Sequence, residues 1–458
     1  MPRQSGSSAP DDETTVAVVG GGFSGLLTTL HLLRQPGAPR VTLIERGPAF
    51  GRGTAFGGAD GTHLLNVRAA NMSAFGDQPD HFVDWLAKHG GAPPTSFVTR
   101  SLYGTYLQGL LREATGKAPA GRLLLDADEA VAATRAGRGW EITTRMGRRL
   151  AADVLVLATG VLPPTPPTAA DPQLLASDRY VADPWAAQAL QGAGERVLLL
   201  GSGLTMVDVA LSLAGGARRL FALSRRGLPP QAHAPAGPPT PMARPYGSPA
   251  ALARQLHAEA RDGDWRTIMD AWRPHVQAIW RSWSLDERRR FLRHLQPWWD
   301  IHRHRLAPVA AERLGRLRRA GDLQVHAGRL EGLSLGDHGV EVRWRPRGAA
   351  EQRLLKVDTV INCAGFGTLA GARDPLLSDL AQQGWLRPDV TGLGVEVGED
   401  GRAGARLYGV GPLCRGALWE ITAVPDIRVQ AAETARAVCR ELAASTPRAV
   451  RKTKSLKS

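Results

Sequence analysis

Two short glycine patterns set the narrowest limits on how this chain can fold. The first, at residues 16–27, reads VAVVGGGFSGLL, an apolar strand that runs into a helix through Gly20, Gly22 and Gly25. Glycines at this spacing allow a tight turn, a pyrophosphate close to the backbone, and a helix packed closely on its strand. Glu45 ends the next apolar run, where a carboxylate can accept hydrogen bonds from ribose hydroxyls. The pattern therefore predicts a Rossmann-like dinucleotide site.

The second pattern, at residues 196–211, reads RVLLLGSGLTMVDVAL. It keeps Gly201 and Gly203 but has Met206 in place of the third glycine. Where the first pattern is followed by an acid, the strand after this helix ends in a hydroxyl and two guanidinium groups: Ser224, Arg225 and Arg226. Such side chains bind a 2′-phosphate by charge-assisted hydrogen bonds, whereas an acid would repel it. The second site is therefore predicted to prefer NADPH over NADH; the alternative is that the arginines are a solvated strand end.

Six apolar runs with little alternation predict parallel strands covered by helices on both faces. These runs are residues 16–20, 41–45, 153–160, 196–201, 220–225 and 358–365. Residues 123–145 and 323–345 instead alternate in the manner of antiparallel hairpins. The predicted fold class is therefore α/β, with two nested Rossmann-like dinucleotide-binding domains.

Changes in composition divide the chain into these domains. Proline-rich stretches after Gly160 and Gly227 favour neither a helix nor a central strand, so they predict crossings between units. The segment richest in Trp, Arg and His is helical in period and predicts an α-helical insertion. The expected parts are a disordered leader over residues 1–13, a first domain over 14–165 and 355–440, a second domain over 190–350 with its insertion at 249–320, and a basic tail over 441–458.

Composition also excludes several classes of protein. The net charge of +14 comes from arginines that are spread along the chain and mixed with acids, so it does not indicate a nucleic-acid surface. No apolar stretch approaches the roughly 20 residues of a membrane span, and the polar start lacks the order of a signal peptide. We expect a cytoplasmic protein that binds neither nucleic acid nor membrane. The three cysteines lie far apart without a CxxC pair, which argues against a dithiol reductase.

Four longer sequence segments resemble those of a known group of proteins. They are GRGTAFGGADGTHLLNVRAANMSAF (51–75), HFVDWL (81–86), RRRFLRHLQPWWDIHRHRLAP (288–308) and GPLCRGALWEITAVPDIRVQAA (411–432). With the two glycine patterns, the chain resembles bacterial FAD/NAD(P)-binding flavoproteins with two dinucleotide-binding domains, which are similar to class B flavin monooxygenases and N-hydroxylases. The resemblance covers most of residues 14–440. It implies FAD at the first site and NAD(P)H at the second.

The resemblance also implies residues around the flavin. Gly51, Gly53 and Asn66 would line the isoalloxazine side of the FAD site. Pro425 and Asp426 begin a predicted helix, and a helix N-terminus directed at the flavin would stabilise negative charge on the reduced ring. Gly411 belongs to the turn before this helix. That turn reads YGVG and lacks the acid that often contacts the ribityl chain in similar proteins.

Three further features leave alternatives open. Glu420 is the one acid in the segment LWEITAVP, where it would either act on or position the flavin or accept hydrogen bonds from N–H groups at the nearby helix start. Trp298 and Trp299 are expected to pack the insertion against the nucleotide-binding domain, with lining of a substrate pocket as the alternative. His302 and His304 stand two residues apart and face different sides of a helix, so we expect no metal site.

These features predict an FAD-dependent oxidoreductase that uses NADPH. The favoured form is a flavin monooxygenase, in which molecular oxygen adds to the reduced flavin and a C4a-(hydro)peroxyflavin oxygenates an N, S or C centre of a small molecule. Residues 160–195 lack the F-x-G-x-x-x-H-x-x-x-W/Y signature of many such enzymes. An NADPH-dependent flavin reductase or dehydrogenase without oxygen activation is therefore the first alternative, and a non-enzymatic nucleotide-binding regulatory protein is the second.

Overall fold

The computed structural model describes residues 13–57, 61–186, 188–235, 242–371 and 373–445. Residues 1–12 of the predicted leader and residues 446–458 of the predicted basic tail lie outside the described residues. Residues 441–445 form the end of helix α14 (Val424–Ser445). No helix in the described ranges combines the length and apolar character needed to cross a bilayer.

The first domain is built on a six-stranded sheet in which only the edge pair is antiparallel. Its order is β15 (Arg402–Gly404), β16 (Leu407–Gly409), β7 (Val154–Leu157), β1 (Thr15–Val19), β2 (Arg40–Ile44) and β3 (Leu123–Asp126). Helices α1 (Phe23–Leu33), α4 (Arg100–Lys117) and α14 lie on one face. The other face packs against α13 (Pro375–Gln382) and a small antiparallel sheet of β4 (Ala130–Ala136), β5 (Gly139–Thr144) and β6 (Arg149–Ala152).

The second domain has a seven-stranded mixed sheet. Its order is β13 (Arg353–Val357), β12 (Gly339–Pro346), β11 (Leu323–Gly336), β10 (Arg219–Ser224), β9 (Arg196–Leu200), β14 (Thr359–Asn362) and β8 (Tyr180–Val181). Helices α6 (Leu204–Leu213) and α12 (Pro308–Ala320) cover one face, and α5 (Pro172–Leu175) packs on the other. The chain forms two nested α/β domains, and the central strands of each main sheet are parallel, as in dinucleotide-binding domains. The predicted fold class is therefore confirmed.

Two details of the strand pairing differ from the sequence expectations. The strand β14 pairs in parallel with β9, so the chain returns to the first sheet only after residue 362 rather than at 355. An apolar run shows that a strand is buried, but not which sheet it joins. The hairpin predicted at 323–345 is confirmed by β11 and β12. In the segment 123–145, β3 instead pairs in parallel with β2, and only β4 and β5 are antiparallel.

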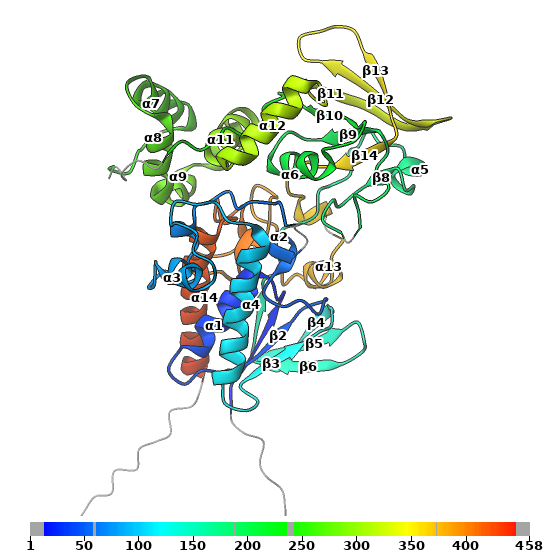
Figure 1. The fold of residues 1–458 in the computed structure, drawn as a ribbon. Coiled ribbons are helices and arrows are strands. Elements are labelled where there is room, and N and C mark those ends of the chain that lie inside the picture. Colours follow the sequence, from blue (N-terminus) through cyan, green and yellow to red (C-terminus); the bar gives the residue numbers. More distant parts are fainter. Residues whose placement is uncertain (1–12, 58–60, 187, 236–241, 372, 446–458) are drawn as a thin grey trace, which may run out of the picture.

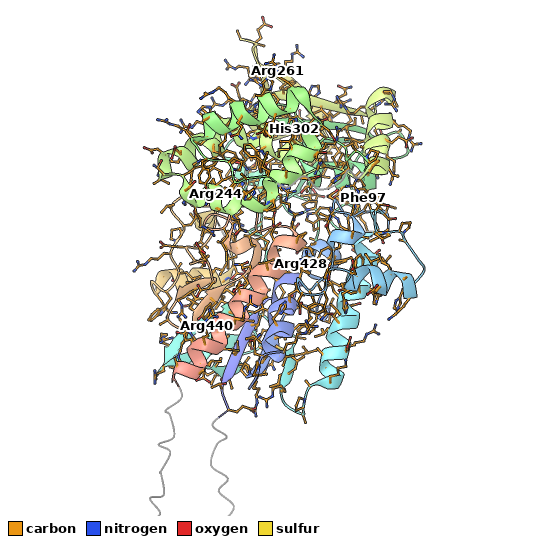
Figure 2. The ribbon with its side chains drawn as sticks, turned by 90° about the vertical axis from the view of Figure 1, so that its left-hand side faces the viewer. Phe97, Arg244, Arg261, His302, Arg428 and Arg440 are labelled. Carbon is orange, nitrogen blue, oxygen red and sulfur yellow. The ribbon has the colours of Figure 1, made fainter. Side chains whose placement is uncertain are left out.

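Residues 249–303 form a bundle of short helices that stands beside the second sheet and above the first domain (Figure 1, Figure 2). Its members are α7 (Pro249–Asp262), α8 (Trp265–Trp272), α9 (Val276–Ser282), α10 (Leu285–Arg290), a π-helical turn (Phe291–Leu295) and α11 (Gln296–Arg303). Side-chain caps start three of these helices, including a capping box of Ser284 and Glu287 at α10. The last helix of the segment predicted as an insertion, α12, packs instead against α6.

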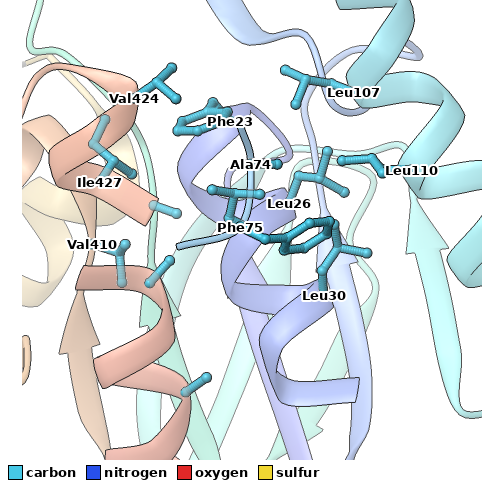
Figure 3. Close-up of a cluster of buried hydrophobic side chains, with 14 of the residues drawn as sticks. Phe23, Leu26, Leu30, Ala74, Phe75, Leu107, Leu110, Val410, Val424 and Ile427 are labelled. Carbon is cyan, nitrogen blue, oxygen red and sulfur yellow. The ribbon is translucent and has the colours of Figure 1, made fainter. Parts of the chain in front are cut away.

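The core of the first domain forms where α1 lies between α4 and α14. Figure 3 shows Phe23, Leu26 and Leu30 of α1 between Leu107 and Leu110 on one side and Val424 and Ile427 on the other. All are buried. Because residues 23–32 of α1 are all buried, the helix is fixed by both neighbours, and its N-terminus is held at one end of the sheet.

The two domains meet through polar contacts that are largely shielded from solvent. The Arg100 guanidinium on α4 lies 2.6 Å from the Asp208 carboxylate on α6. The imidazole of His63 lies 2.7 Å from the Ser212 hydroxyl, also on α6. Asp208 lies in the middle of α6 and Ser212 in its last turn, so the two contacts fix this helix, which begins at the second glycine turn, relative to the first domain.

Candidate functional site

The first glycine turn closes tightly between β1 and α1. Gly20 has a φ of +102°, and a Cβ placed there would lie 2.3 Å from the carbonyl oxygen of Ala158. A Cβ on Gly25 would lie 1.8 Å from the carbonyl oxygen of Gly20, so no side chain fits there without moving the helix away from the strand. Gly22 is the N-cap of α1 and supplies no capping side chain. The N–H groups of the first helical turn therefore lack a side-chain acceptor, as an anion site requires.

Glu45 lies at the end of β2, beside this turn. Its Oε2 accepts a hydrogen bond of 2.7 Å from the backbone N–H of Gly21. The side chain is half-buried, and its attachment to the turn fixes the carboxylate next to the helix N-terminus. This is the place where a ribose attached to a bound pyrophosphate would lie.

Three more glycines predicted from the resemblance converge on the same turn. The N–H of Gly51 donates to the carbonyl of Gly21 over 2.6 Å, and a Cβ on Gly53 would lie 3.0 Å from the Cα of Gly22. From the far end of the chain, Gly411 approaches Ser24 of α1 so closely that a Cβ would lie 2.2 Å from the hydroxyl oxygen. Three segments thus leave side-chain-free backbone around the N-terminus of α1.

This arrangement fits a dinucleotide such as FAD. The cradle contains positions where any side chain would collide with backbone, and its helix N-terminus has no side-chain cap. At the end of β7, next to the turn, the hydroxyl of Thr159 is buried and has no partner within the described chain. Such an orphan donor is expected where a ligand completes the site. Asn66 lies apart from the turn, in the domain interface, where its backbone carbonyl accepts from His233 over 3.1 Å.

The second glycine turn connects β9 to α6. Gly201 has a φ of +115°, and a Cβ there would lie 2.5 Å from the carbonyl oxygen of Cys363. Gly203 is the N-cap of α6, again without a capping side chain, and the space where its Cβ would stand is open. Met206 is fully buried in the core of the second domain. The third glycine is therefore replaced by a side chain that fills the gap between helix and sheet.

The three polar residues at the end of β10 have different surroundings. The hydroxyl of Ser224 lies 2.8 Å from that of Ser202 and accepts from the N–H of Gly227. Arg226 extends toward the helical bundle, where its guanidinium lies 3.4 Å from the carbonyl of His294. Arg225 is exposed and makes no hydrogen bond or ion pair with the described residues. Of the two arginines, Arg225 is therefore the one available to a phosphate.

Glu420 lies where the helical bundle meets the first domain. Its carboxylate accepts a hydrogen bond of 2.9 Å from the indole N–H of Trp299, and the Nε of Arg303 lies 3.0 Å away. His304 adds a third partner, with its Nε2 3.3 Å from Oε1. Glu420 is only 7% exposed, and its backbone has a φ of +68°, which is unusual for a residue with a side chain. Strained backbone of this kind is retained where the surroundings fix it, often at functional sites.

The cluster alters the pKa of each ionisable member. Burial alone would raise the pKa of Glu420, but its cationic and N–H partners outweigh burial and hold that pKa well below the ordinary range. Burial would likewise lower the pKa of His304, but the carboxylate of Glu420 raises it above the ordinary value of 6.5. Desolvation, with a smaller contribution from Glu420, raises the pKa of Asp300 to about 6. Glu420 is thus held as a carboxylate at neutral pH, and its negative charge favours the protonated form of His304.

Other predicted residues have structural partners. Asp426, in the first turn of α14, forms an ion pair of 2.9 Å with Arg273 of the helical bundle. Trp299 contacts Glu420 of the first domain. Within the described residues, no three His, Cys, Asp or Glu side chains are placed to hold a metal ion. Sequence reasoning noticed the HRH and WW segments but missed their pairing with Glu420, because nothing local marks a contact between residues more than 100 positions apart.

Comparisons with known proteins agree with this architecture. Residues 17–162 match a family model described as FAD-NAD(P)-binding. Uncharacterized proteins of Mycobacterium tuberculosis and Mycobacterium bovis are each 30% identical over 131 residues, which is 27% of this chain. The match spans 24% of each relative, about a quarter of its length.

Solved structures are similar over nearly the whole chain. Ornithine hydroxylase from Pseudomonas aeruginosa superposes with a TM-score of 0.64 at 15% identity, over 94% of this chain and 99% of that one. L-lysine 6-monooxygenase from Pseudomonas syringae gives 0.63 at 18% identity over the same shares. Bacillithiol disulfide reductase from Bacillus cereus gives 0.56 at 14% identity, over 93% and 99%. The chain has the fold of the two-dinucleotide-binding flavoproteins. The resemblance drawn from the sequence is confirmed at the level of the fold.

The different surroundings of Arg225 and Arg226 lead to a prediction about the preference for NADPH over NADH. We expect Arg225→Ala to reduce the preference for NADPH over NADH about tenfold or more, because it removes a charge-assisted hydrogen bond worth about 1.5–3 kcal/mol. Arg226→Ala is the matched control and should have the smaller effect, because its guanidinium already lies at the carbonyl groups of the bundle. Steady-state affinities for both nucleotides measure the preference. An unchanged preference in Arg225→Ala would contradict the assignment.

The Glu420 cluster predicts a large effect on stability. Glu420→Gln leaves Arg303 without a counter-charge in a buried place, and breaking a buried ion pair typically costs about 3–5 kcal/mol. The control is Glu433→Gln, because Glu433 and Arg436 form an exposed pair on α14 worth about 1 kcal/mol or less. Urea unfolding of both variants measures the difference. Equal small effects would show that the cluster does not hold the bundle to the first domain.

His304 predicts a pH dependence of opposite sign to that of an ordinary paired carboxylate. Because its folded pKa is raised above 6.5, its contribution to stability is complete below that pH and is lost as the pH rises through the folded pKa. We expect the free energy of unfolding to fall as the pH rises above 6.5 and through the folded pKa of His304, in a range where Asp300, with a pKa of about 6, is mostly ionised. The fall should be smaller in His304→Gln. Parallel pH profiles for the wild type and the variant would contradict this role.

Proposed function

We propose that this chain is an FAD- and NADPH-dependent flavin monooxygenase that oxygenates a small molecule. The observation that carries the proposal is the pair of uncapped glycine turns, one on each parallel sheet, with an acid beside the first and a free arginine beside the second. An acid suits the bare ribose of FAD, and an arginine suits the 2′-phosphate of NADPH. The family described as FAD-NAD(P)-binding matches the first site.

Different residues of the chain would bind different parts of FAD and NADPH. The N-terminus of α1 would bind the pyrophosphate of FAD, Glu45 its ribose, and the N-terminus of α6 with Arg225 would bind NADPH. When bound, FAD would accept hydride from NADPH and use molecular oxygen to oxygenate an N, S or C centre of the substrate. The N-terminus of α14 would stabilise negative charge on the reduced ring. The Glu420 cluster would hold the helical bundle over this region and exclude water.

The choice of oxygenation over disulfide reduction rests on the cysteines and on the similar structures. Thiol–disulfide exchange requires a thiolate. Burial raises the pKa of Cys363 well above the ordinary range and that of Cys414 to about 12, and burial also raises the pKa of Cys439. No two of the three are neighbours in the sequence. The hydroxylase and the monooxygenase give higher TM-scores than the reductase, which supports the same choice.

Rapid mixing with oxygen tests the proposal. The purified holoprotein is reduced with NADPH without oxygen and then mixed with oxygenated buffer while NADP⁺ remains bound. A monooxygenase is expected to lose the reduced-flavin absorbance before the oxidised-flavin absorbance returns, and to release little hydrogen peroxide in the meantime. Free reduced FAD mixed in the same way is the control.

Two outcomes would overturn the proposal. If reduced flavin returned directly to oxidised flavin in one phase, with one hydrogen peroxide per NADPH, the chain would act as a reductase or dehydrogenase without oxygen activation. If the purified protein were colourless and released no flavin on denaturation, it would be a nucleotide-binding protein without flavin chemistry.

A further inference from the structure

The helical bundle encloses an aromatic cavity of about 240 Å³ that neither nucleotide turn reaches. Seven of the chain's 12 tryptophans lie among its described lining residues. Five come from α8, α9 and α11, Trp283 directly follows α9, and Trp419 belongs to the first domain. The cavity is smaller than the roughly 300–1,000 Å³ typical of a site for a whole small molecule. Its size suits one ring system of a larger ligand.

Four of the seven indole N–H groups donate to partners within the described chain, whereas that of Trp419 is buried without a partner there. Trp272 donates its N–H to Glu259, Trp280 to the carbonyl of Gly416, and Trp283 to the carbonyl of Gly247. Trp299 donates to Glu420, as described above. The cavity therefore presents mainly carbon surface. No carboxylate or guanidinium group belongs to the described lining, in which His257 and His302 are the titratable residues. A charged amino-acid side chain would find no counter-ion there.

Three of the seven tryptophans, Trp265, Trp280 and Trp298, have an arginine guanidinium near the ring. The guanidinium carbon of Arg288 lies 5.3 Å from the ring centre of Trp280, and that of Arg266 lies 4.3 Å from Trp265. Arg226 approaches Trp298 at 6.0 Å. Because these rings already have cationic neighbours, they would not favour a quaternary ammonium ligand, although aromatic cages often bind one. The charge and the carbon surface together favour a neutral aromatic group.

The cavity is joined to the candidate flavin site through its own wall. Trp419 stacks on Trp280 with ring centres 4.7 Å apart and is followed directly by Glu420. Trp299 forms another part of the wall and donates to the Glu420 carboxylate. The turn from Glu420 leads within four residues into α14. A group in the cavity is thus held against the segment that positions the N-terminus of α14. Figure 2 shows the bundle, with His302 labelled, directly above α14 with Arg428.

We propose that this cavity binds a neutral aromatic ring of the substrate and so places the atom to be oxygenated toward the flavin. The substrate class is then an aromatic small molecule rather than an aliphatic diamino acid. The binding of a ring follows from the cavity alone, whereas its identity as part of a substrate rests on the proposed function.

Calorimetric titration of the holoenzyme with indole tests the proposal. Ala260 on α7 lines the cavity, so Ala260→Phe fills it, and we expect indole binding to weaken about tenfold or more, which equals about 1.4 kcal/mol. Ala258, on the same helix, is exposed and outside the lining, so Ala258→Phe is the matched control and should leave the affinity unchanged. Benzyltrimethylammonium should bind about tenfold more weakly than indole, and ornithine should not compete with indole.

The results separate this proposal from the proposed function. Equal weakening in both variants, or tighter binding of benzyltrimethylammonium than of indole, would overturn the assignment of the cavity. Flavin content and reduction by NADPH are measured on the same samples. A protein that is reduced by NADPH but binds no indole would overturn only the cavity proposal. A protein without flavin that binds indole in the Ala260-dependent way would overturn only the flavin function.

Discussion

The buried carboxylate of Glu420 is the interaction on which the arrangement of the molecule depends most. It lies between the helical bundle and the first domain. It meets an indole N–H and a guanidinium from α11 and the imidazole of His304, which directly follows that helix. Burying a carboxylate is unfavourable in free energy unless it is paired. Separation of the bundle from the first domain would therefore leave Glu420 and its partners unpaired or expose them to water. The positive φ of Glu420 shows that the backbone accepts strain to present the carboxylate there.

This contact gives the bundle a defined position over the flavoprotein core. A second ion pair, from Arg273 to Asp426, joins the bundle to the first turn of α14. A further ion pair, between Arg100 and Asp208, joins the two nucleotide-binding domains. These three ion pairs therefore fix the positions of the two glycine turns and the aromatic cavity relative to one another. A monooxygenase needs this kind of fixed geometry, because hydride donor, flavin and substrate must be adjacent for transfer.

The local parts of this account could be predicted from the sequence. Glycine spacing, the acid after β2 and the apolar runs act over a few residues, so the sequence specified both turns and the fold class. Partners distant in the sequence could not be predicted. Nothing near Arg225 or Arg226 shows that one faces solvent while the other reaches the bundle. Likewise, Glu420 and Trp299 are 121 residues apart, and Arg273 and Asp426 are 153 apart. Such contacts form only when the helical bundle packs on the first domain, which the local sequence does not specify.

The central claim is that the aromatic cavity and the flavin form one site, and the absorbance spectrum of bound flavin tests it most directly. The oxidised holoenzyme is titrated with indole, and the flavin difference spectrum is recorded at each step. If the cavity and the flavin form one site, the flavin spectrum should change and should saturate at the same indole concentration as the calorimetric binding. Saturable binding of indole with an unchanged flavin spectrum would contradict the claim, because it would show that the cavity and the flavin are separate.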